Sequence, residues 1–352
     1  MPHNTCTWGG RIQRVQPRFV VAVGRLARWF SRRATVIGLS RWLPARLRAR
    51  LRTEVNRLAR SGALYDLPVF LEFPDKAKAG GPHFRIVVYG AFFSDWNAAL
   101  IDRAMWQAIP GVVEVMRLFQ TSQVAGLGPF QGHTLIVPLG EEHIRQCPAG
   151  YPSLVPDLHT VDVLADKSRF AAFMEDTGLA ALCPKTYRRR EDMEFPCILK
   201  RVDQNGAYGI ELVNSADQLD ALLRSRLVAG QKQVLQAFVP GQTEYATHCV
   251  CRDGEILWIC SFARAMGPVP RIGGLDHDSV APVTLAPRAR TQIADVLARL
   301  RFSGPCCVDH KIRDDGDVAI FEINPRFGGS LMASANRAFL GQALTCIIAN
   351  AR

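Results

Sequence analysis

The stretch 321-FEINPRFGGS-330 decides how this sequence is interpreted, because it begins like a strand and ends in two adjacent glycines. A strand repeats every two residues, so Glu322, Asn324 and Arg326 are expected on one face, with Phe321 on the other. A carboxylate and an amide oxygen suit Mg²⁺, which shares its remaining positions with waters and phosphates. The planar guanidinium of Arg326 can hold a phosphate or a carboxylate. An edge strand with a solvated polar face is the alternative interpretation.

The residues before this stretch predict a β-hairpin. In 306-CCVDHKIRDDGDVAIFEIN-324, two apolar runs flank the turn residues 314–316. Pairing of the two strands would bring Asp309 beside Glu322. Two carboxylates so close repel each other unless a cation lies between them. We therefore expect Asp309, Glu322 and Asn324 to bind a metal ion together, with two carboxylates on a solvated hairpin as the alternative.

These residues resemble the metal-binding end of the ATP-grasp family, whose members mostly join a carboxylate to an amine using ATP. The resemblance covers residues 163–329, about half of the chain, and its motifs occur in the order that the family has. It implies an α+β ATP-grasp fold. It also implies ATP as cofactor with one or two Mg²⁺ ions, for which Mn²⁺ is an alternative.

A phosphate-binding lysine and loop are expected in 195-FPCILKRVDQNGAYGIELV-213. An apolar run leads into Lys200, and a glycine-bearing loop follows before extended character resumes. Glycines let backbone N–H groups approach phosphates, while the lysine supplies charge. By the resemblance, Lys200 reaches the α-phosphate and the adenine edge. The loop would cover the β- and γ-phosphates through Gln204, Asn205, Gly206 and Gly209. A snorkelling surface lysine is the alternative interpretation of Lys200.

A helix is predicted after Asp166, which is a suitable N-cap for the apolar face formed by residues 170–174. Lys167 falls in its first turn, where the helix dipole disfavours a cation, so an anion nearby would explain its position. The resemblance implies that Lys167 is a second phosphate contact. A solvated lysine is the alternative.

The nucleoside is expected at the strand 233–239, which enters the turn Pro240-Gly241; a second hairpin turn is predicted at Asp253-Gly254. The resemblance implies contacts with adenine by Gln236, Phe238 and Val239, and with the ribose hydroxyls by Glu244. Many relatives carry a glutamate where this chain has Gln236. An amide oxygen also accepts a hydrogen bond, so the assignment holds.

The loop 264-RAMGPVPRIGG-274 suits an anion-binding cover, and Arg271 resembles an arginine that some ligases place near the reacting carboxylate. A solvated loop is the alternative. His277 and His310 are expected on the surface or beside the site rather than in the chemistry. Cys307 stands where some dipeptide-forming relatives carry an arginine, which leaves the substrate class open.

A chain of 352 residues with 48% hydrophobic residues is expected to form two or three compact units. Between residues 61 and 160, the segments 83–90 and 133–140 are predicted strands and 97–108 is a predicted helix. No apolar run is long enough to cross a bilayer. The expected units are a helical Arg-rich segment at 1–60, a Rossmann-like pre-ATP-grasp α/β domain at 61–160, and an ATP-grasp domain at 161–352.

The net charge of +11 is unevenly placed. Residues 1–60 carry fourteen arginines and one acid, so they hold +13 and the remainder is near −2. Such a segment suits nucleic acid or an anionic membrane surface. We favour a helical brace on the next domain, or an N-terminal extension from an upstream start codon, over binding to nucleic acid or membrane. The Arg-rich character of the segment also resembles a transit peptide. The ten cysteines lack a zinc spacing and, like Cys197, Cys249 and Cys251, are expected as reduced core thiols of a cytoplasmic protein.

Residues and resemblance together predict an ATP- and Mg²⁺-dependent ligase that joins a small carboxylate, such as an amino acid, to an amine. It would form an acyl phosphate and release ADP and phosphate, with Arg326 and Arg271 balancing charge on the transferring group or the carboxylate. A homodimer is common among relatives. The alternatives are carboxylation or phosphorylation by the same fold, and a nucleotide-binding protein anchored to RNA or membrane by its basic N-terminus. The sequence names neither the acid nor the amine.

Overall fold

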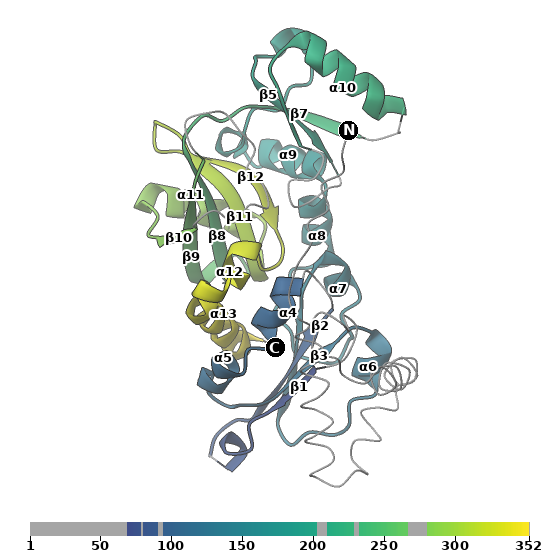
Figure 1. Ribbon diagram of the computed structural model, residues 1–352, viewed down its shortest axis with the longest axis vertical. Helices are drawn as coiled ribbons and strands as arrows, with labels where there is room; N and C mark the ends of the chain where they lie inside the picture. Colours follow the sequence, from purple (N-terminus) through teal and green to yellow (C-terminus); the bar gives the residue numbers. More distant parts are fainter. Residues whose placement is uncertain are drawn as a thin grey trace, which may run out of the picture.

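Three β-sheets follow one another along the longest axis of the molecule (Figure 1). The computed structural model describes residues 69–78, 80–90, 94–202, 210–228, 232–266 and 280–351. The expectations for residues 1–60 therefore lie outside the described residues. In these described ranges, no helix has the length and apolar character needed to span a membrane.

The first sheet has four strands in the order β1-β3-β2-β4, with β2 parallel to both of its neighbours and β1 antiparallel at the edge. The strands are β1 (Val69–Glu72), β2 (Phe84–Tyr89), β3 (Val112–Leu118) and β4 (His133–Pro138). The short helices beside it are η1 (Lys76–Lys78), α4 (Ser94–Leu100), α5 (Arg103–Ala108), α6 (Thr121–Ala125) and α7 (Glu141–Arg145). The predicted strands at 83–90 and 133–140 correspond to β2 and β4.

The single helix predicted at 97–108 is wrong, because the structure divides this region into α4 and α5. Asp102 lies between them in extended conformation, and its side chain accepts a hydrogen bond from the Met105 backbone N–H at 3.1 Å. This is N-cap geometry, which starts a new helix instead of continuing the old one.

The central sheet has five antiparallel strands in the order β10-β9-β8-β11-β12. They are β8 (Thr243–Arg252), β9 (Glu255–Ala265), β10 (Ala281–Val283), β11 (Gly304–Ile312) and β12 (Val318–Asn324). Both predicted hairpins are present. Asp253 and Gly254 join β8 to β9 with φ values of 48° and 90°, the left-handed pair that a two-residue hairpin turn requires.

The third sheet is antiparallel, in the order β6-β5-β7, and α10 (Ala216–Val228) packs on β6. Its strands are β5 (Cys197–Arg201), β6 (Glu211–Val213) and β7 (Gln233–Ala237). The buried residues Cys197, Leu199 and Leu219 form a small core between sheet and helix. Since alternate strand residues face opposite ways, Ile198 and Lys200 are left on the face away from this core.

Two consecutive helices precede the third sheet, α8 (Leu158–Ala165) and α9 (Lys167–Asp176). The side chain of Asp166 accepts hydrogen bonds from the backbone N–H groups of Ser168 and Arg169 at 2.8 and 3.1 Å, which confirms the predicted N-cap. The 3₁₀ helices η2 (Ala180–Leu182) and η3 (Arg190–Asp192) follow before β5.

One face of the central sheet is covered by α11 (Pro287–Arg299), whose residues Ala289, Ile293 and Val296 repeat at helical spacing and are fully buried. Cys249 and Cys251 belong to the same core, and Cys197 lies in the core of the third sheet. All three are free and buried, which confirms the prediction of core thiols.

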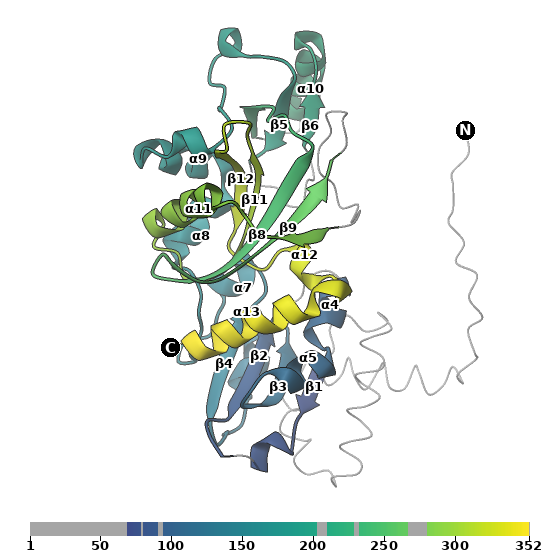
Figure 2. The same cartoon turned by 90° about the vertical axis from the view of Figure 1, so that its left-hand side faces the viewer.

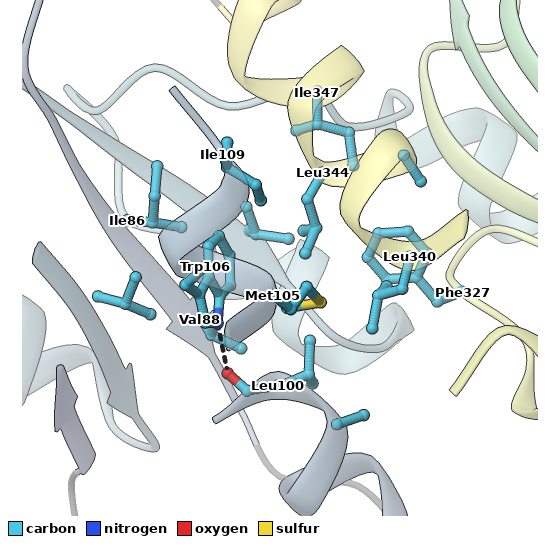
Figure 3. Close-up of a cluster of buried hydrophobic side chains, with 14 of the residues drawn as sticks. Ile86, Val88, Leu100, Met105, Trp106, Ile109, Phe327, Leu340, Leu344 and Ile347 are labelled. Atoms are coloured by element: carbon cyan, nitrogen blue, oxygen red, sulfur yellow. Dashed lines mark hydrogen bonds between the residues drawn. The ribbon is translucent and has the colours of Figure 1, made fainter. Parts of the chain in front are cut away.

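The other face of the central sheet contacts α13 (Arg337–Asn350), which lies between this sheet and the first one (Figure 2). The short helices α12 (Gly329–Met332) and η4 (Ser334–Asn336) lead into it from the end of β12. Leu340 and Leu344 of α13 meet Met105 and Trp106 of α5 in one core, and Phe327 packs there as well (Figure 3). The core thus anchors the segment that directly follows Arg326.

Trp106 offers a test of this shared core. It is fully buried, and its indole N–H donates to the Leu100 carbonyl at 2.9 Å. Trp106→Phe removes the donor and part of the ring, so we expect the free energy of unfolding to fall by about 2–4 kcal/mol in urea titrations. Trp258→Phe is the matched control, because Trp258 is only partly buried and donates at 3.3 Å to an exposed Gln342. Equal losses in the two variants would contradict the assignment.

Candidate functional site

Asp309 and Glu322 lie directly opposite each other in the register of β11 and β12, as the predicted hairpin requires. The side-chain amide of Asn324 donates one hydrogen bond to Asp309 Oδ2 and one to Glu322 Oε1, each at 3.1 Å. The three residues predicted to share a metal ion are therefore brought together on one patch at the end of the hairpin.

The patch has the character of a cation site. Negative charge is crowded there, because Glu322 and Glu244 lie near Asp309. Burial and these two carboxylates raise the pKa of Asp309. In the part of the chain that the structure describes, no group of three or more His, Cys, Asp and Glu side chains is arranged to hold a metal. The donor set is instead two carboxylates and one amide. Such a small set of hard oxygens fits Mg²⁺, which keeps positions for water and phosphate.

A β-bulge changes the predicted alternation of β12. Asp309 pairs with Glu322, but His310 pairs with Ile320, so Phe321 is an extra residue on β12. Ile320 and Ile323 both point into the α11 core. Phe321 stays outside that core, and its ring centre lies 5.4 Å from Lys200 Nζ. The expectation that Phe321 lies on the face opposite Glu322 is therefore wrong, since the bulge turns it toward the site.

Two buried lysines approach the same carboxylates. Lys167 Nζ lies 3.5 Å from Glu322 Oε2. This carboxylate is the nearby anion that was expected from the position of Lys167 in the first turn of α9. Lys200 is only 7% exposed, so the interpretation as a surface lysine is wrong. Burial and the charge of Lys167 lower the pKa of Lys200, while Glu322 and Glu244 raise it. A further anion such as a phosphate would favour the charged form of Lys200.

Arg326 connects the patch to the first sheet. Its Nη2 donates to Asn324 Oδ1 at 3.0 Å, so it lies on the predicted side. Its Nη1 donates to the Phe327 carbonyl, and its Nε lies 3.6 Å from Glu141 Oε1 on α7. The guanidinium is buried between the Asn324 amide and the carboxylate of Glu141, which comes from a distant part of the sequence.

The residues predicted to hold the nucleoside lie around the turn after β7. Gln236 donates to Thr186 Oγ1 at 3.4 Å, whereas its buried Oε1 accepts no hydrogen bond within the described residues. Burial raises the pKa of Glu244, against the lowering effect of Arg264 and Lys311. The free amide oxygen of Gln236 is available to a ligand donor such as the amino group of a purine.

Sequence reasoning missed Lys311. It placed Arg264 in the loop 264–274, which is wrong, because Arg264 lies on β9. Lys311 Nζ donates to the carbonyls of Val239 and Gly241 at 3.0 and 2.9 Å and lies 5.2 Å from the centre of the Phe238 ring. Arg264 pairs with Glu244 in the register of β8 and β9. The alternation from Asp309 to Lys311 along β11 could have pointed to the lysine.

His310 was expected on the surface or beside the site. The surface expectation is wrong, because His310 is fully buried, bonds to Thr247 at 2.9 Å and stacks on Tyr245. Burial lowers the pKa of its imidazole to about 4. The remaining sequence-predicted residues, Arg271, Gln204, Asn205, Gly206, Gly209 and His277, lie outside the described residues.

A cavity of about 840 Å³ adjoins the nucleoside end of the site. Phe238 and Val239 line it together with Met174, Cys183 and Tyr187. Asp309, Glu322, Lys167 and Lys200 do not line it. Burial raises the pKa of the Cys183 thiol in its wall to about 12, against the lowering effect of Arg313 and Lys200. The cavity therefore lies beside the turn after β7 and does not surround the carboxylates.

Comparison with known proteins agrees with this geometry. Residues 164–330, a little under half of the chain, match the family model described as ATP-grasp domain. The structure resembles D-alanine–D-alanine ligase from Bacillus anthracis complexed with ATP, with a TM-score of 0.51 and 17% identity over 77% of this chain and 97% of that one. It also resembles phosphoribosylamine–glycine ligase from Thermotoga maritima, with a TM-score of 0.55 and 14% identity over 75% of each chain. These likenesses show the fold.

A similar sequence is 5-formaminoimidazole-4-carboxamide-1-(beta)-D-ribofuranosyl 5'-monophosphate synthetase from Pyrobaculum arsenaticum, 24% identical over 204 residues. The match covers 52% of this chain and 58% of that protein. The chain thus spans little more than half of the length of this relative.

Gly328 is predicted to tolerate no side chain. Its φ of −99° is open to any residue, but a Cβ there would lie 2.5 Å from Cys307 Sγ and 2.7 Å from His248 Cε1. We expect Gly328→Ala to lower the free energy of unfolding by about 1–3 kcal/mol through overpacking. In the control Gly341→Ala, the new methyl meets Met105 at an ordinary 3.5 Å within α13, so a gain of up to about 1 kcal/mol is expected. Urea titrations that show the same sign for both variants would contradict this.

Proposed function

We propose that this protein is an ATP- and Mg²⁺-dependent ligase that joins a small carboxylate to an amine through an acyl phosphate and releases ADP and phosphate. One observation carries the proposal: Asp309, Glu322 and Asn324 meet at the end of a hairpin with two buried lysines beside them. This combination places cation ligands and phosphate-binding charges within one cluster.

Lys167 and Lys200 would bind the phosphates of ATP, and Glu244 the ribose. The base would lie against Phe238 and Val239, where the 840 Å³ cavity adjoins the turn after β7. Gln236 Oε1 would accept from the amino group of the base, which satisfies a buried acceptor that has no other hydrogen bond in the described chain.

Asp309, Glu322 and Asn324 would hold one or two Mg²⁺ ions, with Mn²⁺ as an alternative. When bound, the metal would supply positive charge that offsets the negative charge of the phosphates. The protein contributes a rigid, crowded set of oxygens, because the β11–β12 pairing fixes where Asp309 and Glu322 can lie.

In the reaction, an oxygen of the substrate carboxylate attacks the γ-phosphorus, and the bond to the ADP oxygen breaks. The amine nitrogen then attacks the acyl carbon, inorganic phosphate leaves, and the amine loses a proton. Arg326 would hold the substrate carboxylate or the transferring phosphoryl group, since its fork of donors fits either one. Arg271 is proposed to assist it. No side-chain nucleophile is needed, because positioning and charge stabilisation carry phosphoryl transfer.

The unit at 61–160 is proposed to be a Rossmann-like pre-ATP-grasp domain that shapes the acceptor side, followed by an ATP-grasp domain at 161–352. The Glu141 contact with Arg326 supports this, because it places the first unit beside the residue that would grip the substrate. The similar proteins, two ligases and a synthetase by name, also favour a ligase. We propose small-molecule substrates and a cytoplasmic location.

Hydroxamate trapping tests this function. Purified protein would be incubated with ATP, Mg²⁺ and hydroxylamine, and screened against pools of amino acids and other small carboxylates. A hydroxamate that depends on one pool is expected, because hydroxylamine captures an acyl phosphate, and it would identify the acid. ADP formed with a phosphorylated or carboxylated product and no hydroxamate would overturn ligation in favour of another chemistry of the fold.

Glu322→Gln tests the cation site. It removes one charge from the crowded patch and leaves the size of the side chain unchanged, so we expect hydroxamate formation to fall by at least about 100-fold. The melting temperature should be retained or raised, because the repulsion from Asp309 is removed. Glu191→Gln is the matched control, since Glu191 is 68% exposed on η3, and it should keep full activity. Retained turnover in Glu322→Gln would remove Glu322 from the site.

A further inference from the structure

Two buried side chains lie directly beneath the proposed cation site and have no role in the proposed chemistry. Cys307 and His248 are neighbours in the register of β11 and β8, and both are almost fully buried. Cys307 Sγ lies 3.6 Å from Asp309 Oδ1, with the geometry of a thiol donor. His248 Nε2 lies 4.0 Å from that sulfur and 2.7 Å from Ser330 Oγ. A continuous row of side chains thus runs from Asp309 to the start of α12.

The two oxygens of Asp309 have different partners. Oδ1 faces the Cys307 thiol, while Oδ2 accepts from the Asn324 amide, which also bonds Glu322. Without a partner for Oδ1, the carboxylate could rotate about its bond to Cβ. The thiol therefore helps to select the rotation in which Oδ2 faces the other two proposed ligands.

The loop that carries Arg326 rests on the same pair. A Cβ at Gly328 would lie 2.5 Å from Cys307 Sγ and 2.7 Å from His248 Cε1, so the loop backbone touches both side chains. The loop is held at its far end as well, because Asn336 Nδ2 donates to the Ser330 carbonyl at 2.7 Å while His248 holds the Ser330 hydroxyl. Displacement of the loop would therefore disturb Cys307, and the reverse also holds.

We propose that Cys307 and His248 are positioning residues that set the affinity of the proposed cation site, Cys307 by orienting the Asp309 carboxylate and His248 by holding Ser330 so that the loop stays seated on Cys307. This inference rests on the proposed function. Groups that orient metal ligands typically change metal affinity 10- to 100-fold when they are removed, without touching the metal themselves.

The test measures metal binding without turnover. Mn²⁺ binding to the full chain would be followed by electron paramagnetic resonance in the presence of a non-hydrolysable ATP analogue. Cys307→Ala removes the donor, and we expect it to weaken Mn²⁺ binding about 10-fold. Cys307→Ser keeps a donor and should recover most of that loss. Binding of the analogue in EDTA should be unchanged in both variants.

Cys306→Ala is the matched control. Cys306 is equally buried, but it faces the α11 core on the other side of β11, so its loss should lower stability without changing Mn²⁺ affinity. The inference is overturned if Cys307→Ala binds Mn²⁺ as tightly as Cys306→Ala does. Failure of the unmodified chain to bind Mn²⁺ with the analogue would instead remove the proposed function itself, so the two failures are distinguishable.

His248→Leu tests the second half of the proposal, because leucine is close to histidine in volume and loses the bond to Ser330. Its Mn²⁺ affinity should fall by a similar factor. In the double variant with Cys307→Ala, the two losses should be less than multiplicative, since both residues act through one row of contacts. Fully independent losses would contradict the coupling.

Discussion

The structure of the site depends on one constraint, the direct pairing of Asp309 with Glu322 across the β11–β12 hairpin. Two carboxylates held opposite each other in a mostly buried place repel, and burial adds to the cost of their charge. Positive groups from three other segments offset this repulsion. They are Lys167 at the start of α9, Lys200 on β5, and Arg326 after β12. Their convergence follows from the hairpin, because each of them is placed close to one of its two acids or to the amide between them.

The hairpin can hold this arrangement because both of its sides are fixed. On one side, Ile320 and Ile323 enter the α11 core. The bulge between them lets the side chains of Phe321 and Glu322 both face the site. On the other side, Phe327 enters the core shared by α5 and α13. Packed cores resist small displacements, so the carboxylates and the amide held between two of them keep their positions. This is the preorganisation that charge stabilisation requires.

Local features of this fold were predictable from the sequence, and features that depend on pairing were not. The Asp166 cap and the turns at 253–254 and 314–316 are set by residues a few positions apart, so short patterns identify them. The orientation of Phe321 depends on a bulge that no glycine marks. The contacts of Arg326 with Glu141 and of Lys311 with Val239 join segments far apart in the chain, which periodicity cannot bring together. The convergence of Asp309, Glu322 and Asn324 was predictable because one hairpin contains all three.

Arg326 has a special place in this arrangement, because it touches both the proposed cation site and the first unit of the molecule. Its guanidinium lies between Asn324 and Glu141, so a substrate carboxylate that it bound would compete with Glu141 for the same donors. Cys307 adds no charge beside it, although some dipeptide-forming members of the fold are expected to carry an arginine there. Under the proposed function, binding of an anionic substrate would therefore depend more heavily on Arg326 in this chain than in those relatives. The proposed function would for that reason couple substrate selectivity to the position of α7, which holds Glu141, through one side chain.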